Sequence, residues 1–419
     1  MRLAGWASFV PVGAALAGLA MAGAWSIRLG WADYRMRRET VGGMEAAIAL
    51  TPDQSEYYAR LAWLVSNHDP QKAKEALGRA VALNPWDARS WIELGLRAEA
   101  EGDGATSEEC LLRAAKADHT FLPRWTLANY YFRHDDLAKF WFWAKQSAAM
   151  VYGDAQPLFL LCGRVEEDGK LIDRLQIRAP EVQAGYLSYL LGKNRADLIG
   201  PAVARLAAGN READVSLLMS ACERLLEAGR INEAAEVWNR QAAAGRVGFR
   251  TPAGEGEQLA ANGDFAVVPA SRGFDWRLPP VDGVSVSRED DGQGLRVTFS
   301  GREPEDCEVL AQLVPVREKM QYELGFMYRT RGIANGQGLG WRITDANRGT
   351  ALGEGGGVAS EGDAEGRLTF ATPAECRLVR LALRYHRSPG TTRMEGFIIL
   401  RRVAVKPAQL PIDGSRVRK

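Results

Sequence analysis

The feature that most constrains the fold of this chain is an internal repeat in its first half, with a period of about 34 residues. The stretch AAIALTP (46–52) returns as RAVALNP (79–85), with Pro52 and Pro85 at the same place in the two copies, and a third copy, AAKADH, begins at Ala114. A period of this length predicts stacked helical hairpins, because one hairpin alone cannot bury its apolar face.

The first helix of each unit recurs with the same spacing, as YYARLAWL, WIELGLRA and WTLANYYF. The small residues Ala62, Gly95 and Ala128 occupy one position of it and are evenly spaced by the repeat period. A small side chain lets the two helices of a hairpin approach closely. The proline at the end of the second helix stops that helix, because it has no backbone N–H to donate.

Over residues 45–150 this pattern resembles the tetratricopeptide repeat. The packing positions of that family are matched by Trp91, Leu94, Gly95, Ala98, Leu111 and Ala114 in one unit. Two features depart from the pattern. His119 stands where the family has proline, and the aromatic run 140–143 stands where the family has small residues. Two interpretations of that run stay open, namely core packing and an exposed aromatic platform. Degenerate repeats are predicted to continue to about residue 245.

The resemblance implies that a protein partner binds the inner face formed by the first helices. In this chain that face would include Arg89, Ile92, Leu96, Glu99, Asn129, Phe132 and Arg133. Some family members clamp a peptide carboxylate with a set of lysines and asparagines. This set is missing, which disfavours the tail of a chaperone as the ligand.

After a Pro- and Gly-containing stretch at 249–260 the helical period disappears, and short runs of alternating polarity replace it. The clearest are LRVTFS (295–300), QYELGFMYRTR (321–331) and LGWRITD (339–345). Eight or nine such strands predict an antiparallel β-sandwich or jelly roll. The glycine-rich stretch Gly353–Gly366 is expected to be a flexible loop.

The stretch NGDF (262–265), followed by GFDW (273–276), resembles the first strand of galactose-binding-like jelly rolls, which include many carbohydrate-binding modules. The resemblance implies that aromatic side chains on one sheet face stack on sugar rings. The candidates in this chain are Trp276, Tyr328, Trp341 and Tyr385. The alternative is that these rings fill the core. The chain has Met-Glu-Gly at 394–396 where many members have paired acidic residues, so a structural calcium ion is not expected.

The N-terminus has an uncharged stretch, Leu3 to Ile27, between Arg2 and Arg28. Its length exceeds the ~20 apolar residues that cross a bilayer as a helix, and we expect a single-pass inner-membrane anchor with an extracytoplasmic, periplasmic body. A cleaved signal peptide is the alternative, since small residues surround Ala20-Met21-Ala22. The arginines after the segment argue for a cytoplasmic body by the positive-inside rule, and that conflict stays open.

The predicted organisation of the chain is a membrane anchor or signal segment at 1–30, helical repeats at 31–248, a linker at 249–260, a β-sandwich at 261–407 and a basic tail at 408–419. The predicted fold class is therefore an α-solenoid followed by an antiparallel β-sandwich. Cys307 and Cys376 would be able to pair if the second half lies outside the cytoplasm.

The formal net charge is +1, from 53 Lys+Arg and 52 Asp+Glu, so no general field favours nucleic acid. The four histidines show no metal-ligand spacing, and no nucleophile motif occurs. We therefore expect no cofactor, no metal ion and no catalysis. The sequence predicts a membrane-anchored scaffold that binds a protein through its repeats and a saccharide through its sandwich, in cell-surface or exopolysaccharide assembly. A pure protein-interaction adaptor, whose sandwich is structural, is the alternative; a carbohydrate-active enzyme is a weaker one.

Overall fold

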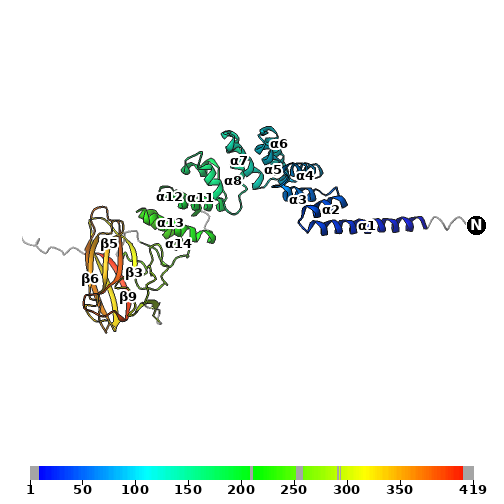
Figure 1. The fold of residues 1–419 in the computed structure, drawn as a ribbon. Coiled ribbons are helices and arrows are strands. Elements are labelled where there is room, and N and C mark those ends of the chain that lie inside the picture. Colours follow the sequence, from blue (N-terminus) through cyan, green and yellow to red (C-terminus); the bar gives the residue numbers. More distant parts are fainter. Residues whose placement is uncertain (1–8, 208–210, 252–257, 290–291, 293, 409–419) are drawn as a thin grey trace, which may run out of the picture. The chain divides into compact units, whose positions relative to one another are not determined.

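A computed structural model describes residues 9–207, 211–251, 258–289, 292 and 294–408. The chain divides into two compact units, residues 1–182 and 183–419, and each is described by itself. The first is helical and the second joins helices to a β-sandwich (Figure 1). The predicted fold class, helical repeats followed by an antiparallel sandwich, is confirmed.

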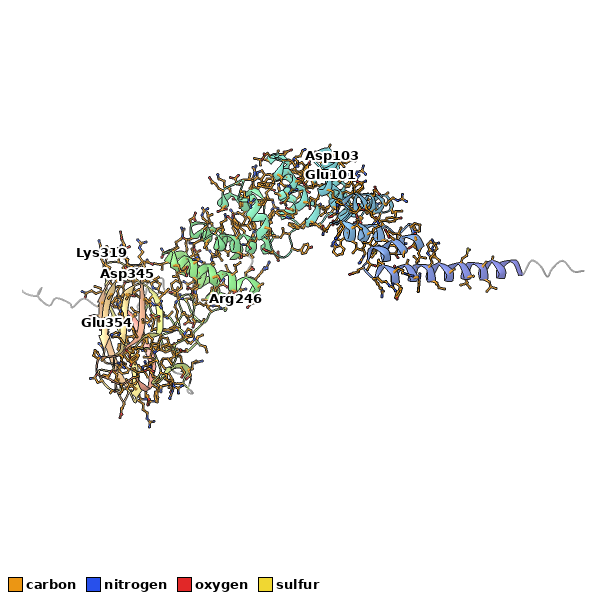
Figure 2. The ribbon with its side chains drawn as sticks, viewed as in Figure 1. Glu101, Asp103, Arg246, Lys319, Asp345 and Glu354 are labelled. Atoms are coloured by element: carbon orange, nitrogen blue, oxygen red, sulfur yellow. The ribbon has the colours of Figure 1, made fainter. Side chains whose placement is uncertain are left out.

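Antiparallel helices stacked in succession form the first unit. Its α-helices are α1 (Phe9–Met36), α2 (Val41–Leu50), α3 (Ser55–Val65), α4 (Pro70–Leu83), α5 (Ala88–Ala100), α6 (Gly104–Ala117), α7 (Phe121–Arg133), α8 (Leu137–Ala148), α9 (Gln156–Cys162) and α10 (Leu171–Arg174). The three units of the sequence repeat are the hairpins α3–α4, α5–α6 and α7–α8. The second helices begin in the same way: Asp69, Asp103 and Asp136 each accept a hydrogen bond at 3.0 Å from a backbone N–H in the first turn. Figure 2 shows Asp103 beside Glu101 at the turn between α5 and α6.

Gly95 allows α5 and α6 to pack closely. A Cβ added there would lie 2.8 Å from Cγ and Cδ2 of Leu111, a side chain that is 0% exposed. The neighbouring hairpins are then joined by polar contacts, such as the hydrogen bond of 3.0 Å from Tyr130 Oη to the Gly104 carbonyl. The small-residue position identified in the sequence therefore has the predicted role.

The predicted membrane-spanning anchor is not supported. The N-terminal segment is helical from Phe9, but the residues that the structure describes include no helix with the length and apolar character needed to cross a bilayer. The described part of the segment is rich in alanine and glycine, and α1 continues beyond it through Arg28 and Arg35. Residues 1–8 of the predicted anchor, 252–257 of the predicted linker and 409–419 of the predicted basic tail lie outside the described residues.

The second unit contains most of α11 (Pro180–Gly192), then α12 (Ala196–Ala207), α13 (Val215–Glu227) and α14 (Ile231–Ala243). Its strands are β1 (Val284–Arg288), β2 (Leu295–Ser300), β3 (Asp306–Pro315), β4 (Gln321–Arg331), β5 (Leu339–Asp345), β6 (Ala351–Gly356), β7 (Ala364–Ala371), β8 (Leu378–His386) and β9 (Glu395–Pro407). They form a five-stranded sheet, β1-β2-β9-β4-β7, and a four-stranded sheet, β3-β8-β5-β6, with every pairing antiparallel.

One sequence expectation about this unit is wrong, and one disulfide that the sequence left open does not form. The glycine-rich stretch Gly353–Gly366 is not simply a loop, because β6 and the start of β7 lie in it. Glycine leaves room for the side chains of the facing strand. Leu368 of β7 packs 3.5 Å from the position that a Cβ of Gly355 on β6 would take. Cys307 and Cys376 are both free thiols. Cys307 lies at the start of β3, and Cys376 lies beside the end of that strand. At about 3.4 Å per residue the two thiols are about 30 Å apart, far beyond the reach of a disulfide.

The NGDF and GFDW stretches fasten the start of the sandwich to its core. Asp275 is 2% exposed and accepts hydrogen bonds from the N–H groups of Ala270 (2.7 Å) and Trp276 (2.8 Å). The Trp276 indole N–H donates to the carbonyl of Asn262 at 3.0 Å. Burial raises the pKa of Asp275 despite these donors. The motif is thus structural.

The last helical hairpin packs against this first segment of the sandwich. Glu223 of α13 pairs with Arg277 at 2.9 Å, and Trp238 of α14 packs against Phe274 with the ring centroids 6.0 Å apart. Gly273 fits under the Trp238 ring, where a Cβ would come within 2.2 Å of the indole. The helices α13 and α14 therefore belong to the same compact unit as the sandwich, although composition alone suggests a boundary at 249–260.

The glycine packing predicts opposite outcomes for one substitution at two helical sites. Gly95→Ala should destabilise the repeats by about 1–3 kcal/mol, because the added methyl group overpacks against Leu111. Gly78→Ala, in the middle of α4 with open space around its Cβ, should stabilise them by up to about 1 kcal/mol. Thermal unfolding followed by far-UV circular dichroism measures both, and equal stabilisation by the two variants would contradict the packing described.

Candidate binding surfaces

The four aromatic residues predicted to stack on a saccharide are in the core between the sheets. Trp276 and Tyr385 are 0% exposed, Trp341 is 1% exposed and Tyr328 is 8% exposed. The rings of Trp276 and Trp341 lie 6.2 Å apart, and Phe326 packs on Trp341 at 5.7 Å. The stacking hypothesis is therefore wrong for this conformation, and the alternative of core packing holds. Alternation along a strand separates its two faces but does not tell which of them is the inner one.

The predicted inner face of the repeats is partly assembled as expected. Glu99 of α5 and Arg133 of α7 lie on it and form two hydrogen bonds, of 2.9 and 2.7 Å, between consecutive hairpins. The Arg133 guanidinium holds the pKa of Glu99 below its usual range. Arg89 is exposed, and Leu96 is 39% exposed.

The other three predicted residues of this face offer less to a partner. Ile92 is a correction, because it is only 8% exposed and packs within the repeat. The Asn129 amide donates to the carbonyl of Trp125 at 2.8 Å, and Phe132 is half-buried against Phe140. The aromatic run 140–143 is divided: Phe140 is fully buried and Phe142 is 56% exposed, so neither interpretation of the run holds for all of it.

Sequence reasoning missed Trp63, which is 75% exposed at the end of α3. It follows the small residue Ala62, as Leu96 follows Gly95 and Asn129 follows Ala128. The repeat period was therefore a sufficient signal that Trp63, Leu96 and Asn129 occupy equivalent positions on α3, α5 and α7. Trp63 adds a large exposed aromatic ring to the predicted face.

The outer face of the five-stranded sheet carries a shallow depression of about 270 Å³. Its floor is made by strands β7, β4 and β9, where Gly325 pairs with Arg367 on one side and with Ala404 on the other. A Cβ at Gly325 would meet nothing within 4 Å. A glycine in a strand interior weakens the strand and often marks a place where a ligand approaches the backbone closely. The lining residues are Glu323, Gly325, Phe326, Met327, Glu365, Gly366, Arg367, Arg402, Ala404 and Lys406. We call this feature the Gly325 depression.

The charges around the Gly325 depression are arranged differently from those on the outer face of the opposite sheet. On that opposite face, Arg384 bonds to Asp306, and Arg380 bonds to Glu308. The Arg384 guanidinium lowers the pKa of Asp306, and Asp306 in turn raises the pKa of Arg384. The exposed carboxylate of Glu354 on β6 also raises the pKa of Arg384 (Figure 2).

Within the described part of the chain, by contrast, three charged residues of the depression form no ion pair: Glu323, Arg402 and Lys406. Arg367 contacts only Glu365 of its own strand, at 3.9 Å, and both side chains are largely exposed. The depression thus presents charged donors and acceptors that have no strong partner in the protein. Nothing in the sequence pattern marked them, because their proximity depends on β4 pairing with β7 and β9.

No group of three His, Cys, Asp or Glu residues that could hold a metal ion occurs among the described residues. A second cleft, of about 530 Å³, lies between α13 and strands β3 and β8. Its charged lining is already paired, Glu223 with Arg277 and Arg380 with Glu308.

No family model and no curated protein matches the sequence. Similar solved structures include a CBM4 module, which matches over 36% of this chain and 99% of its own length, with 14% identity and a TM-score of 0.29. The carbohydrate-binding module CBM6cm-2 of Cellvibrio mixtus lichenase 5A, solved with cellotriose, matches over 32% of this chain and 92% of its own length, with 12% identity and a TM-score of 0.22.

YrrB, described as a TPR protein with an unusual peptide-binding site, matches over 48% of this chain and 91% of its own length, with 12% identity and a TM-score of 0.23. The chain is thus a helical-hairpin repeat protein that also contains an antiparallel β-sandwich, a class defined by its own structure. Similarities this weak say nothing about its ligands, which have to be inferred from its own side chains.

The Glu99–Arg133 contact predicts an acid-sensitive stability of the repeats. Because the folded-state pKa of Glu99 is lowered, its contribution is present above the unfolded value of 4.5 and is lost as the pH falls through the folded value. Glu99→Gln should therefore cost about 1 kcal/mol at pH 7 and progressively less toward pH 3. Chemical denaturation at both pH values measures this difference. The control is Glu109→Gln, which removes an exposed i,i+4 pair with Arg113 and should have little effect at either pH. A destabilisation by Glu99→Gln that does not change with pH would contradict the stabilising role given to the Glu99–Arg133 ion pair.

Proposed function

We propose that this protein is a non-catalytic scaffold that binds a protein partner along the inner face of α3, α5 and α7 and a saccharide in the Gly325 depression. Its proposed setting is the assembly of a cell-surface or exopolysaccharide polymer outside the cytoplasm. The observation that carries the proposal is the Gly325 depression itself, a glycine-floored hollow on the outer face of strands β9, β4 and β7.

Saccharides need hydrogen-bond donors and acceptors around a shallow, open surface. The Gly325 depression offers both kinds of group, on side chains that reach in from β4, β7 and β9. At about 270 Å³ it is smaller than the roughly 300–1,000 Å³ typical of pockets that enclose a small molecule. A polymer chain that lies across the sheet, rather than an enclosed metabolite, suits such a hollow.

The repeats support binding to a protein partner. Trp63 and Leu96 expose apolar surface at equivalent positions of two hairpins, and the charged side chains of Arg89, Glu99 and Arg133 lie on the same face. Aromatic and arginine side chains are enriched among the residues that dominate protein interfaces. The alternative function, a pure adaptor whose sandwich is structural, shares this half of the proposal and lacks the saccharide.

The glycine at the centre of the depression gives the sharpest test of the saccharide half. Gly325→Val should leave the stability of the sandwich unchanged or raise it by up to about 1 kcal/mol, because valine favours a strand and open space surrounds the position. The same variant should weaken saccharide binding at least tenfold by filling the hollow. Affinity gel electrophoresis of the full chain in gels containing dextran or polygalacturonate measures binding, and thermal unfolding measures stability.

Thr344→Val is the matched control, since Thr344 lies on the outer face of the four-stranded sheet and the substitution introduces the same β-branched side chain. It should leave binding unchanged. Retardation of the wild-type chain by neither polysaccharide, or equal retardation of Gly325→Val, would favour the adaptor with a structural sandwich.

The protein-binding half makes its own prediction. Trp63→Ala should weaken capture of the partner at least tenfold, because truncation of a large aromatic anchor in an interface costs about 2 kcal/mol or more. Tyr152→Ala is the control, because Tyr152 is 82% exposed and lies outside the face formed by α3, α5 and α7. Cross-linking followed by mass spectrometry of the captured protein measures the effect. Equal loss with both variants, or with neither, would place the interface elsewhere.

A further inference from the structure

We infer that the saccharide bound in the Gly325 depression is anionic, with a carboxylate or sulfate group on its rings. This inference rests on the proposed function and specifies the ligand of the same site. It follows from three observations, namely the spacing of the cationic side chains, the lack of partners for two of them and the lack of an exposed aromatic ring in the lining.

The strand register places three cations around the centre of the depression. Three rows cross the sheet: Thr369–Glu323–Lys406, Arg367–Gly325–Ala404 and Glu365–Met327–Arg402. Neighbouring rows are about 7 Å apart and neighbouring strands about 4.8 Å. Arg367 is therefore diagonally opposite both Arg402 and Lys406 across Gly325, about 12 Å from each at the Cα atoms.

Long cationic side chains at that separation can converge above the glycine. Gly325 has no side chain and Ala404 has only a methyl group, so little fills the space between the cations. An anionic group can therefore lie close to the sheet while the three cations approach it from the sides. Arginine binds carboxylate and sulfate-like oxyanions with two parallel hydrogen bonds. The hollow is thus suited to one charged ring of a polymer.

The two carboxylates of the lining do not cancel this preference. Glu323 is directly opposite Lys406 in the first row, and Glu365 is within 3.9 Å of Arg367 on its own strand. Three cations against two carboxylates leave a local excess of positive charge. The carboxylates can accept hydrogen bonds from ring hydroxyl groups, which distinguishes a sugar acid from an anion without hydroxyls.

The lining also disfavours recognition by stacking. Among its described residues the one aromatic ring is that of Phe326, which is half-buried and packs on Trp341 in the core. A neutral polysaccharide would find no flat apolar surface for its ring faces. Charge-assisted hydrogen bonds are then the strongest contacts that this surface can make.

The test uses affinity gel electrophoresis of the full chain with four polymers: polygalacturonate, dextran sulfate, neutral dextran and polyglutamate. Polygalacturonate or dextran sulfate should retard the protein, and the stronger of the two identifies carboxylate or sulfate as the recognised group. Dextran and polyglutamate should not retard it. Binding should weaken as salt is raised, because exposed charges are screened.

Two variants and one control assign the effect to this site. Arg402→Gln and Lys406→Gln should each weaken binding to the anionic polysaccharide about tenfold, and both residues are exposed and unpaired within the described part of the chain, so the fold should persist. Arg60→Gln removes the same charge from an exposed pair on α3 and should leave binding unchanged.

The outcomes separate this inference from the proposed function. Retardation by dextran that is abolished by Gly325→Val but unchanged by Arg402→Gln would overturn the anionic ligand and leave saccharide binding intact. Retardation by polyglutamate equal to that by polygalacturonate would also overturn it, because the surface would then select charge without sugar. No retardation by any polymer would remove both proposals.

Discussion

The pairing of β4 with β7 and β9 is the constraint on which the sandwich and its candidate site both depend. It sets Gly325 between Arg367 and Ala404 on the outer face, while Tyr322 and Leu324 enter the core on the inner face. Because side chains alternate between faces, a slip of one residue would exchange the two sets. Burial of the apolar side chains therefore fixes the register and, with it, the position of the charged ones.

That division also explains why the Gly325 depression is lined mainly by charged rather than aromatic side chains. Large rings pack between the sheets instead, where the Trp341 ring lies 6.2 Å from that of Trp276 and 5.7 Å from that of Phe326. Around the depression the outer face is left mainly with charged side chains, whereas Phe397, elsewhere on the same face, lies under the Arg296 guanidinium. On the four-stranded sheet, Arg380 and Arg384 pair with carboxylates, whereas in the depression charged side chains surround a glycine. The two arrangements differ little in stability, since exposed ion pairs contribute little.

Sequence pattern alone was enough for the architecture. The repeat period located the hairpins and the close-packing role of Gly95, and alternation located most strands, with bounds that agree for 321–331 and 339–345. The site was not predictable in the same way. A period of two separates the faces of a strand without telling which is buried, and Arg367 and Arg402 meet β4 only through pairings between distant strands.

The most direct test of the account asks whether an anionic polysaccharide covers the Gly325 depression. Met327 lines it and Met320 lies just outside it before β4, and both are 39% exposed, so they form a matched pair of oxidation probes. Hydroxyl-radical footprinting with and without polygalacturonate or dextran sulfate compares them. The account predicts protection of Met327 and unchanged oxidation of Met320; equal protection of both, or protection of neither by a polymer that binds, would contradict it.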